Sequence, residues 1–376
     1  MIFPAAEFQG RVARLQARMA DAGIDALLLT TPPDVFYVTG FLTRFWESPA
    51  RPWFVIVPAK GAPVAVIPSI GAGLMGKTWL SDIRTWDAPD LVDDGVSLLA
   101  STLGDLVPDT GAVGLHMGLE THLRMPLADY ERLRAALAPR HFADATGLVQ
   151  RVREVKSEAE IDRIRQTCAI AGRAFDRVPE IAGAGAPLER VFRDFQRLLL
   201  EEGAEWVSYL AGGAGPGGYG DVISPASDRP LARGDVLMLD TGAVREGYFC
   251  DFDRNWAVGG ADDASRRAYD RLYAATEAGL AAARPGMTAG GLYRAMAAVT
   301  GDVSGRIGHG LGLSLTEWPS LIPSDRTELR AGMVLTLEPW VEIAPGRMMV
   351  HEENVVIREG AAELLSPRAA AELPVI

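Results

Sequence analysis

The chain has 376 residues, of which 48% are hydrophobic, and its 37 basic and 49 acidic residues leave a formal net charge of -12. This length exceeds one typical hydrophobic core, so two domains are expected, and the acidic balance argues against nucleic acid or a membrane as a partner. The sequence has two cysteines, no secretory leader pattern and no apolar run long enough to span a bilayer, and it therefore predicts a cytoplasmic protein.

The first part of the chain alternates strand-like and helical patterns. Apolar residues recur at helical spacing from Phe8 to Ala22, and the strand-like runs DALLLT, VFYVTG and PWFVIVPAKGAPVAVIP follow. A further helix is expected from Pro126 to Leu137, because a proline suits the first helical turn. This alternation predicts a smaller α/β domain over residues 1–152.

The second domain is expected over residues 153–376, with its boundary in the segment RVREVKSEAEID. Ser157 and Glu160 form a capping-box pattern at the start of a helix there. Helices are then predicted over 187–200, 263–283 and 288–299. Most of the candidate site residues lie on strand patterns between and after these helices, which makes the whole chain an α+β protein.

Three aspartates lie close together in the stretch LMLDTGAVREGYFCDFDRNWAV. Two strands joined by a turn around Gly247 would form a hairpin that brings Asp240 near Asp251. Because side chains alternate along a strand, Asp253 shares a face with Asp251. A divalent cation would resolve the repulsion between these carboxylates, although a lone hairpin of this kind is more often a solvated arrangement.

Later segments add further candidate ligands. His309 lies between two glycines, where the backbone can come close to a ligand, and Glu338 lies in an apolar strand just before a proline. A buried carboxylate must be paired or bound to metal. In MMVHEENVVI, the alternation places His351 and Glu353 on one strand face and Glu352 on the opposite face.

In these motifs the chain resembles the pita-bread metallohydrolases, a family that includes prolidase, aminopeptidase P, methionine aminopeptidase and the metal-free creatinase. The match consists of D-x-G with a second Asp, then GHGxG, EP and a late Glu, here at Asp240, Asp251, His309, Glu338 and Glu353. The first domain also looks like the creatinase and prolidase amino-terminal domain. The resemblance implies a curved antiparallel sheet backed by helices, with the metals in its concave face.

The same resemblance implies roles for these five residues. Asp240 would chelate one ion, His309 would complete the other, and Asp251 and Glu353 would bridge the two ions. Glu338 would bind metal and accept a proton from the attacking water, whose pKa two neighbouring ions lower. Oxygen-rich ligation with one imidazole favours manganese, with iron, cobalt or zinc as alternatives.

Two departures from the family pattern concern proton transfer. Proline-directed members carry a histidine in an HExP motif, and Thr316 occupies that place here, while a second family histidine corresponds to Ile223. Neither side chain can transfer a proton near neutral pH as imidazole does. Asp253 stands where the family commonly has Thr and His351 where Arg is usual, so either could supply proton transfer. Alternatively, Asp253 pairs with a nearby cation and His351 is a packed strand residue.

Substrate contacts are harder to assign. The segment GFLTRFWESPARPW holds Arg44 and Trp46, and by resemblance this region reaches the partner's active site in a homodimer, where an Arg could bind a carboxylate. The glycine-rich stretch LAGGAGPGGYG is expected to form a flexible pocket rim that includes Tyr209 or Tyr219. Thr316 is a further candidate because of its place in the pattern. Surface or core packing is the alternative for Arg44 and Trp46.

Three functional classes follow from these observations. The first is an Xaa-Pro dipeptidase or aminopeptidase that acts on small peptides. The second is a non-peptidase hydrolase or lyase of an amino-acid-like or creatine-like compound, which the missing histidines favour. The third is a binding protein on a dead enzyme fold, and the intact set of five ligand residues disfavours it.

Overall fold

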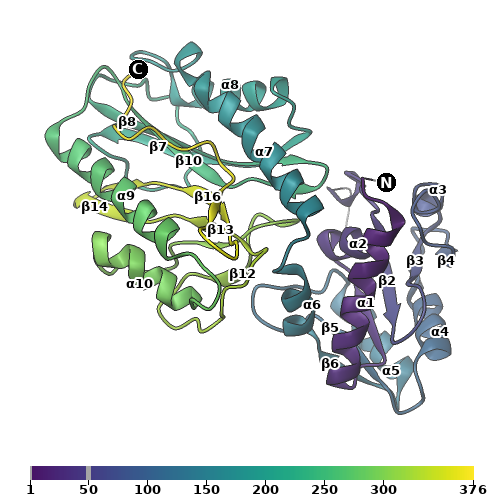
Figure 1. The fold of residues 1–376 in the computed structure, drawn as a ribbon. Helices are drawn as coiled ribbons and strands as arrows, with labels where there is room; N and C mark the ends of the chain where they lie inside the picture. Colours follow the sequence, from purple (N-terminus) through teal and green to yellow (C-terminus); the bar gives the residue numbers. More distant parts are fainter. Residues whose placement is uncertain (1, 48–51) are drawn as a thin grey trace. The chain divides into compact units, whose positions relative to one another are not determined.

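The structure, a computed structural model, describes residues 2–47 and 52–376. The chain divides into two compact units, Met1–Arg153 and Glu154–Ile376. The boundary expected from the sequence lies one residue earlier. Each unit has its own sheet and core, and Figure 1 shows their elements in chain order.

The first unit is built on a mixed six-stranded sheet with the order β4-β3-β2-β1-β5-β6. Its strands are β1 (Ala26–Leu29), β2 (Phe54–Pro58), β3 (Val64–Pro68), β4 (Ile83–Trp86), β5 (Ala112–Leu115) and β6 (His141–Asp144). The central strands β1, β2, β3 and β5 are buried along their whole length, as their apolar sequences predict. The α/β character expected for this domain is therefore present.

Helices flank this sheet, namely α1 (Ala5–Ala22), α2 (Pro32–Thr39), α3 (Ala72–Met75), α4 (Val96–Leu106), α5 (Leu127–Leu137) and α6 (Thr146–Arg153). The prediction of a strand at VFYVTG is wrong, because this segment is α2. Two prolines occupy the first helical positions, and Gly40 ends the helix in the left-handed conformation. These end signals override the β-branched and aromatic composition that favoured a strand.

A buried ionic cluster ties α2 to the end of the first unit. Asp34 is 2% exposed and accepts hydrogen bonds from Thr31 at 2.5 Å and from Arg153 at 2.7 Å. Its other neighbour is His116, whose Nε2 lies 2.9 Å from the carboxylate. Burial alone would raise the pKa of Asp34, but the adjacent His116 and Arg153 hold it well below its usual value.

The second unit contains four long helices, α7 (Glu158–Asp176), α8 (Leu188–Glu201), α9 (Asp263–Ala282) and α10 (Ala289–Thr300). The capping box predicted at the start of α7 is confirmed. The Glu160 amide donates to Ser157 Oγ at 3.3 Å, and the Ser157 amide donates to the Glu160 carboxylate at 3.0 Å. The other three helices lie within a residue of their predicted bounds.

Every strand pair within the sheets of this unit is antiparallel. One sheet has the order β10-β8-β7, with β9 also paired to β8, a second has the order β12-β11-β13-β16-β17, and β14 pairs with β15. The strands are β7 (Trp206–Pro216), β8 (Asp235–Arg245), β9 (Tyr248–Phe249), β10 (Phe252–Ala257), β11 (His309–Gly310), β12 (Glu317–Ser320), β13 (Val334–Leu337), β14 (Trp340–Ala344), β15 (Arg347–Val350), β16 (Glu353–Val356) and β17 (Glu363–Leu364).

The helices cover these sheets in two groups (Figure 1). Helices α7 and α8 pack on the sheet of β7 and β8, and α9 packs on β13, β14 and β15. A core cluster joins α10 to β13 and β16 through residues such as Leu292, Met296 and Leu335. Antiparallel sheets backed by helices agree with the fold implied by the family resemblance.

The glycine-rich stretch predicted to be a flexible rim is mostly regular strand. Residues Leu210–Pro216 belong to β7 and pair residue by residue with β8. Gly212 has a φ of +155°, and a Cβ there would collide with the backbone of Met238 on β8. The glycines therefore serve close strand packing rather than mobility.

Among the described residues, no helix is both long and apolar enough to cross a bilayer. Cys168 and Cys250 are free thiols, and both are buried.

Candidate metal centre

The strand pair of β8 and β10 brings three aspartates close to one another. Asp253 lies directly opposite Asp240 in the register. Asp251 comes just before β10 and lies outside the strand pairing. Its carboxylate raises the pKa of Asp240, so these two carboxylates are within electrostatic reach of each other.

The backbone around His309 fixes the direction of its imidazole. The His309 amide donates to Thr336 Oγ1 at 3.1 Å, and Nδ1 lies 2.9 Å from the Gly310 carbonyl oxygen. Nε2 then points to Asp251, 3.4 Å from Oδ2. A Cβ at Gly308 would collide with the Thr336 carbonyl, so the close approach of β11 to β13 requires glycine at that position.

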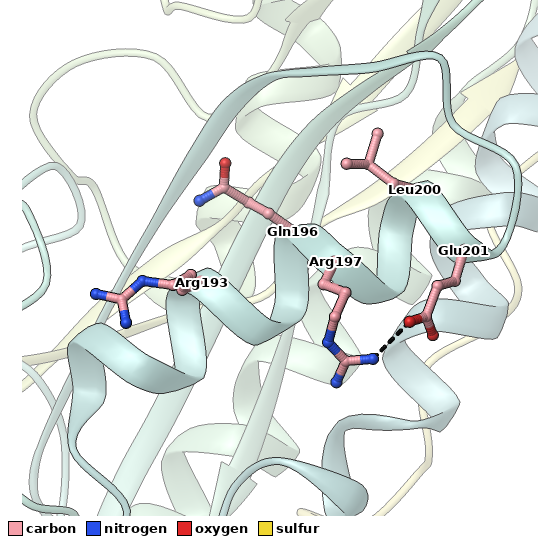
Figure 2. Close-up of a pocket in the computed structure, with 5 residues that line it drawn as sticks. All are labelled: Arg193, Gln196, Arg197, Leu200 and Glu201. Carbon is pink, nitrogen blue, oxygen red and sulfur yellow. Dashed lines mark hydrogen bonds and ion pairs between the residues drawn. The ribbon is translucent and has the colours of Figure 1, made fainter.

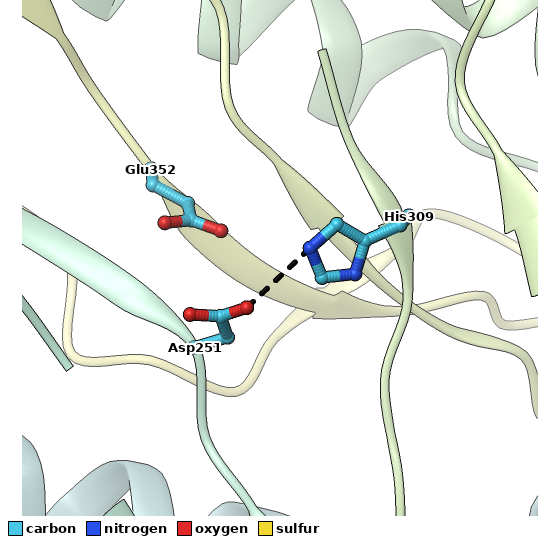
Figure 3. Close-up of side chains that lie close together, drawn as sticks. All are labelled: Asp251, His309 and Glu352. Carbon is cyan, nitrogen blue, oxygen red and sulfur yellow. Dashed lines mark ion pairs between the residues drawn. The ribbon is translucent and has the colours of Figure 1, made fainter. Parts of the chain in front are cut away.

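A third acidic side chain completes a compact group with these two. Ligand atoms of Asp251, His309 and Glu352 all lie within 4.8 Å of one another, and all three residues are buried. Figure 3 shows the two carboxylates and the imidazole converging on one space. Glu338, directly after β13, also belongs to this cluster, because its carboxyl group interacts electrostatically with His309 and Asp251.

The placement of Glu353 predicted from the sequence is wrong by one residue. Its carboxylate receives hydrogen bonds from Arg254 Nη2 at 3.0 Å, from the Ala369 amide at 2.8 Å and from the Ser366 hydroxyl. Glu352, which the alternation rule turned away, occupies the cluster instead. The reason is that β15 ends at Val350 and β16 begins at Glu353, so residues 351–352 belong to neither strand and do not follow strand alternation.

His351 does not reach the acidic cluster. Its Nδ1 lies 3.0 Å from Thr276 Oγ1, and its ring packs edge-on against Tyr269 and Tyr273. Burial, with the nearby positive charge of Arg254, lowers its pKa to about 3. The imidazole is therefore neutral, and these contacts favour the packing alternative for His351.

Asp253 lies beside the cluster, but both of its carboxylate oxygens are engaged. Oδ1 accepts the Glu352 amide at 2.5 Å, and Oδ2 accepts Asn255 Nδ2 at 2.9 Å. The alternative that Asp253 merely pairs with a cation is incomplete, because Arg254 bonds the carbonyl oxygen of Asp253 rather than the carboxylate. A proton-transfer role for Asp253 has no support in these contacts.

Burial and mutual repulsion govern the electrostatics of the cluster. Burial raises the pKa of Asp240, and the negative charges of Asp251 and Glu338 raise it further. Burial also raises the pKa of Glu352, with further increases from Asp251 and Asp240. The pKa of Asp251 is raised by burial, with Arg306 opposing the shift. The protein therefore concentrates more negative charge here than its own cations neutralise.

The donor set fits hard divalent cations. Asp240 Oδ1 and Glu352 Oε1 are buried and accept no hydrogen bond in the described structure. Buried carboxylate oxygens normally have a hydrogen-bond partner, so these two unpaired oxygens together with one imidazole indicate a site for a divalent cation. The five side chains that would hold it are Asp240, Asp251, His309, Glu338 and Glu352.

Other residues of the cluster were missed or only partly assigned from the sequence. Burial raises the pKa of Tyr209, and the negative charge of the nearby Asp240 carboxylate raises it further. Arg306 lies close enough to act on Asp251 and Glu338. Neither residue lies in a motif, and only the pairing of β7 with β8 brings Tyr209 to the aspartates.

The positions of the two missing histidines differ in environment. Ile223 is 80% exposed, and Thr316 is half-buried just before β12. The neighbouring Glu317 is held by Lys156, whose Nζ lies 3.1 Å from Oε2, and by the Leu313 and Ser314 amides. The Glu317 carboxylate is therefore already bonded to the loop that follows His309.

The remaining substrate-binding candidates lie elsewhere. Tyr219 is 1% exposed, and its hydroxyl bonds Asn255 at 3.1 Å and the Val350 amide at 2.6 Å, so it is a core residue and not a pocket rim. In the first unit, Arg44 pairs with Glu47 at 2.8 Å. Trp46 packs against Trp53 with ring centroids 5.4 Å apart. Contacts of Arg44 and Trp46 with substrate stay predictions.

A cavity of about 510 Å³ lies outside the acidic cluster, on the outer face of α8. Figure 2 shows the residues that line it, Arg193, Gln196, Arg197, Leu200 and Glu201. Arg197 and Glu201 are paired at 2.6 Å, and Leu200 is 51% exposed. Nothing in this helix surface offers a buried polar group for chemistry.

Comparison with known proteins finds relatives that are named dipeptidases. The chain is 31% identical over 368 residues to the probable dipeptidase PepE of Mycobacterium tuberculosis, with 94% of this chain and 93% of that protein covered. It is 25% identical over 363 residues to an Xaa-Pro dipeptidase of Pyrococcus horikoshii, with 94% and 96% covered. The crystal structure of dipeptidase PepE from Mycobacterium ulcerans has a TM-score of 0.86 at 29% identity, covering 100% of this chain and 99% of that one.

Two family models divide the chain between them. The creatinase/prolidase N-terminal domain matches residues 11–155, and metallopeptidase family M24 matches residues 162–359, more than half of the chain. The resemblance inferred from the motifs is confirmed, and so is the combination of an α/β first domain with an antiparallel second domain. The chain therefore belongs to metallopeptidase family M24 and carries a creatinase/prolidase-type N-terminal domain.

Proposed function

We propose that this protein is a metal-dependent dipeptidase that hydrolyses small peptides, with Xaa-Pro dipeptides as its first substrate class. The observation that carries the proposal is the buried cluster of Asp251, His309 and Glu352, extended by Asp240 and Glu338. The similarity of the whole chain to proteins named dipeptidase and Xaa-Pro dipeptidase supports the same substrate class.

Two divalent cations are the proposed cofactor. Asp240, Asp251, His309, Glu338 and Glu352 would hold them, and Mn²⁺ suits this oxygen-rich set better than a thiolate-type zinc site, with Fe²⁺, Co²⁺ and Zn²⁺ as competitors. When bound, such ions activate water as a nucleophile and polarise the carbonyl that is attacked. Glu352 replaces Glu353 in the bridging role that the family resemblance implied.

The protein side chains contribute orientation and proton transfer. Glu338 is the proposed proton acceptor, because its carboxyl group lies within electrostatic reach of His309 and Asp251. The pairing of β7 with β8 places Tyr209 near Asp240 at the edge of the site. Burial of the surrounding residues excludes bulk water and strengthens these electrostatic interactions.

An alternative substrate class follows from the two missing histidines. Thr316 and Ile223 cannot protonate a leaving amine or hold a substrate carboxylate as imidazolium does. The loss of both imidazoles therefore favours, as the alternative, a hydrolase or lyase of a creatine-like or other amino-acid-like compound. The M24 relatives named dipeptidases favour the peptidase, and an assay with both substrate classes separates the two proposals.

We further propose a cytoplasmic homodimer. Two free, buried thiols suit a reducing compartment. The Arg44 side chain is 51% exposed and could meet a substrate carboxylate in the partner's site. Sedimentation velocity tests the dimer, and an Arg44→Ala variant with a raised KM but an unchanged kcat would support the substrate contact.

The deciding experiment is a metal-loading assay. Apo protein is loaded with Mn²⁺ and tested on Xaa-Pro dipeptides, other dipeptides, longer peptides and creatine-like compounds. We expect turnover of dipeptides that Asp251→Ala abolishes. Protein that binds no Mn²⁺ and turns over none of these compounds would refute both enzyme proposals.

A further inference from the structure

The two segments that carry Asp251 and Glu352 come from different sheets and hold each other through side chains. β10 pairs with β8, and β16 pairs with β13 and β17, so no backbone ladder joins β10 to β16. The two strands nevertheless lie in contact. What fixes one acidic residue against the other must therefore come from side chains.

Asn354 holds the backbone of Asp251 on both sides. It is 0% exposed, and its Oδ1 accepts the Asp251 amide at 3.0 Å while its Nδ2 donates to the Asp251 carbonyl oxygen. Oδ1 is also approached by Cys168 Sγ at 3.3 Å. One carboxamide thus satisfies both backbone polar groups of Asp251, at the break between β9 and β10 where strand pairing would otherwise do so.

The segment that carries Asp251 holds the backbone of Glu352 in the same way. Asp253 Oδ1 accepts the Glu352 amide at 2.5 Å, and Arg254 Nη1 donates to the Glu352 carbonyl oxygen at 3.0 Å. Asn255 Nδ2 bonds Asp253 Oδ2 at 2.9 Å and the Val350 carbonyl oxygen at 2.8 Å, which orients the aspartate. Each segment therefore holds the backbone of the other. In both segments the clamping side chains lie two or three residues after the acidic residue.

We propose that Asn354 and Asp253 are positioning residues that keep the carboxylates of Asp251 and Glu352 together against their mutual repulsion and thereby set the affinity for the metal ions. A site built this way is assembled before a cation arrives. Without the clamps, two buried like charges on separate sheets would move apart, and metal binding would have to draw them back. The proposal rests on the metal site proposed above.

A purely structural role for these bonds predicts a different result. Buried hydrogen bonds stabilise any fold, so their loss would lower the melting temperature whether or not metal is involved. Only positioning predicts that metal affinity falls out of proportion to stability. Co²⁺ absorption gives an independent readout, because its visible bands report coordination geometry.

The test is calorimetric titration of apo protein with Mn²⁺, together with Co²⁺ spectra and thermal melts. The variants are Asn354→Ala, Asp253→Val and Asp253→Asn, which keeps an acceptor for the Glu352 amide. Thr300→Val is the control, because its buried hydroxyl bonds only backbone oxygens at the end of α10. We expect Asn354→Ala and Asp253→Val to bind about 10–100-fold more weakly, with altered Co²⁺ spectra, and Thr300→Val to bind as the wild type does.

Asp253→Asn separates positioning from charge. The clamp is supported if Asp253→Asn binds Mn²⁺ about as tightly as the wild type while Asp253→Val binds it more weakly. Equal losses of Mn²⁺ affinity in both variants would show that the charge of Asp253 matters, and would overturn the proposal. Unchanged Mn²⁺ affinity in a folded Asn354→Ala variant overturns it as well. If that variant does not fold, the two Asp253 variants decide alone. Wild-type protein that binds no Mn²⁺ would instead refute the metal site itself.

Discussion

The neighbouring glutamates 352 and 353 differ so much in environment that exchanging each for glutamine should have opposite effects. In the structure Glu352 faces Asp251 and His309, whereas Glu353 receives hydrogen bonds from Arg254, Ser366 and Ala369. Glu352→Gln removes a charge from a repelling cluster. Glu353→Gln removes the partner of a buried guanidinium.

The expected magnitudes follow from these contacts. The side chains of Arg254 and Glu353 are 12% and 3% exposed, and breaking a buried ion pair by removing one partner costs about 3–5 kcal/mol. Glutamine still accepts one hydrogen bond, so we expect Glu353→Gln to lower the free energy of unfolding by about 3 kcal/mol. Glu352→Gln should leave the stability of the apo protein unchanged or higher, since it relieves repulsion, but weaken metal binding by at least about tenfold, or 1.4 kcal/mol.

Urea unfolding of the apo proteins and Mn²⁺ titration measure the two quantities on the same samples. The expected pattern is crossed: one variant loses metal and keeps stability, while the other loses stability and keeps metal. A Glu353→Gln protein that is as stable as the wild type but binds no Mn²⁺, beside a Glu352→Gln protein that binds normally, would refute the assignment.

Three further outcomes are expected. Asp34→Ala should destabilise the first unit by about 3–5 kcal/mol in urea unfolding, because it breaks the buried ion pair between Asp34 and Arg153. Because the pKa of Asp34 is depressed in the folded state, its contribution to stability is complete above about pH 4 and is lost as the pH falls below that value. The stability difference between Asp34→Ala and wild type should therefore shrink in acid. A constant difference down to pH 2 would contradict this. Ser157→Ala should cost about 1 kcal/mol through loss of the capping box of α7, with the exposed Ser97→Ala as a control that changes little. Removing Mn²⁺ from the loaded protein with a chelator should lower the melting temperature. If the free ion stood at 1,000 times its Kd, the loss in the free energy of unfolding is about 4 kcal/mol. An unchanged melting curve would count against a tightly bound metal.

Local signals predicted much of the fold. The capping box at Ser157 and Glu160 fixed the start of α7, because reciprocal side-chain bonds require those residue types at that spacing. The hairpin that opposes Asp240 to Asp253 followed from alternation and a turn at Gly247. These features depend on a few neighbouring residues and little on the rest of the chain.

Features that periodicity does not encode were missed. Periodicity could not show that two prolines and Gly40 turn residues 32–39 into a helix against their strand-like composition. It also placed Glu353 in the site, because nothing local marks the end of β15 at Val350. Tyr209 and Arg306 reach the cluster only through tertiary pairing, so no motif identified them.

The five candidate ligands are divided between two sheets. Asp240 lies on β8 and Asp251 just before β10, whereas His309, Glu338 and Glu352 lie on or beside β11, β13 and β16. A bound ion would therefore act as a cross-link between the two sheets, comparable to a structural zinc in a small domain. Amide hydrogens of β10 and β16 should then exchange together and slowly in the loaded protein, and separately once the metal is removed. In this protein the group that carries out catalysis would also make the second unit a single cooperative folding unit.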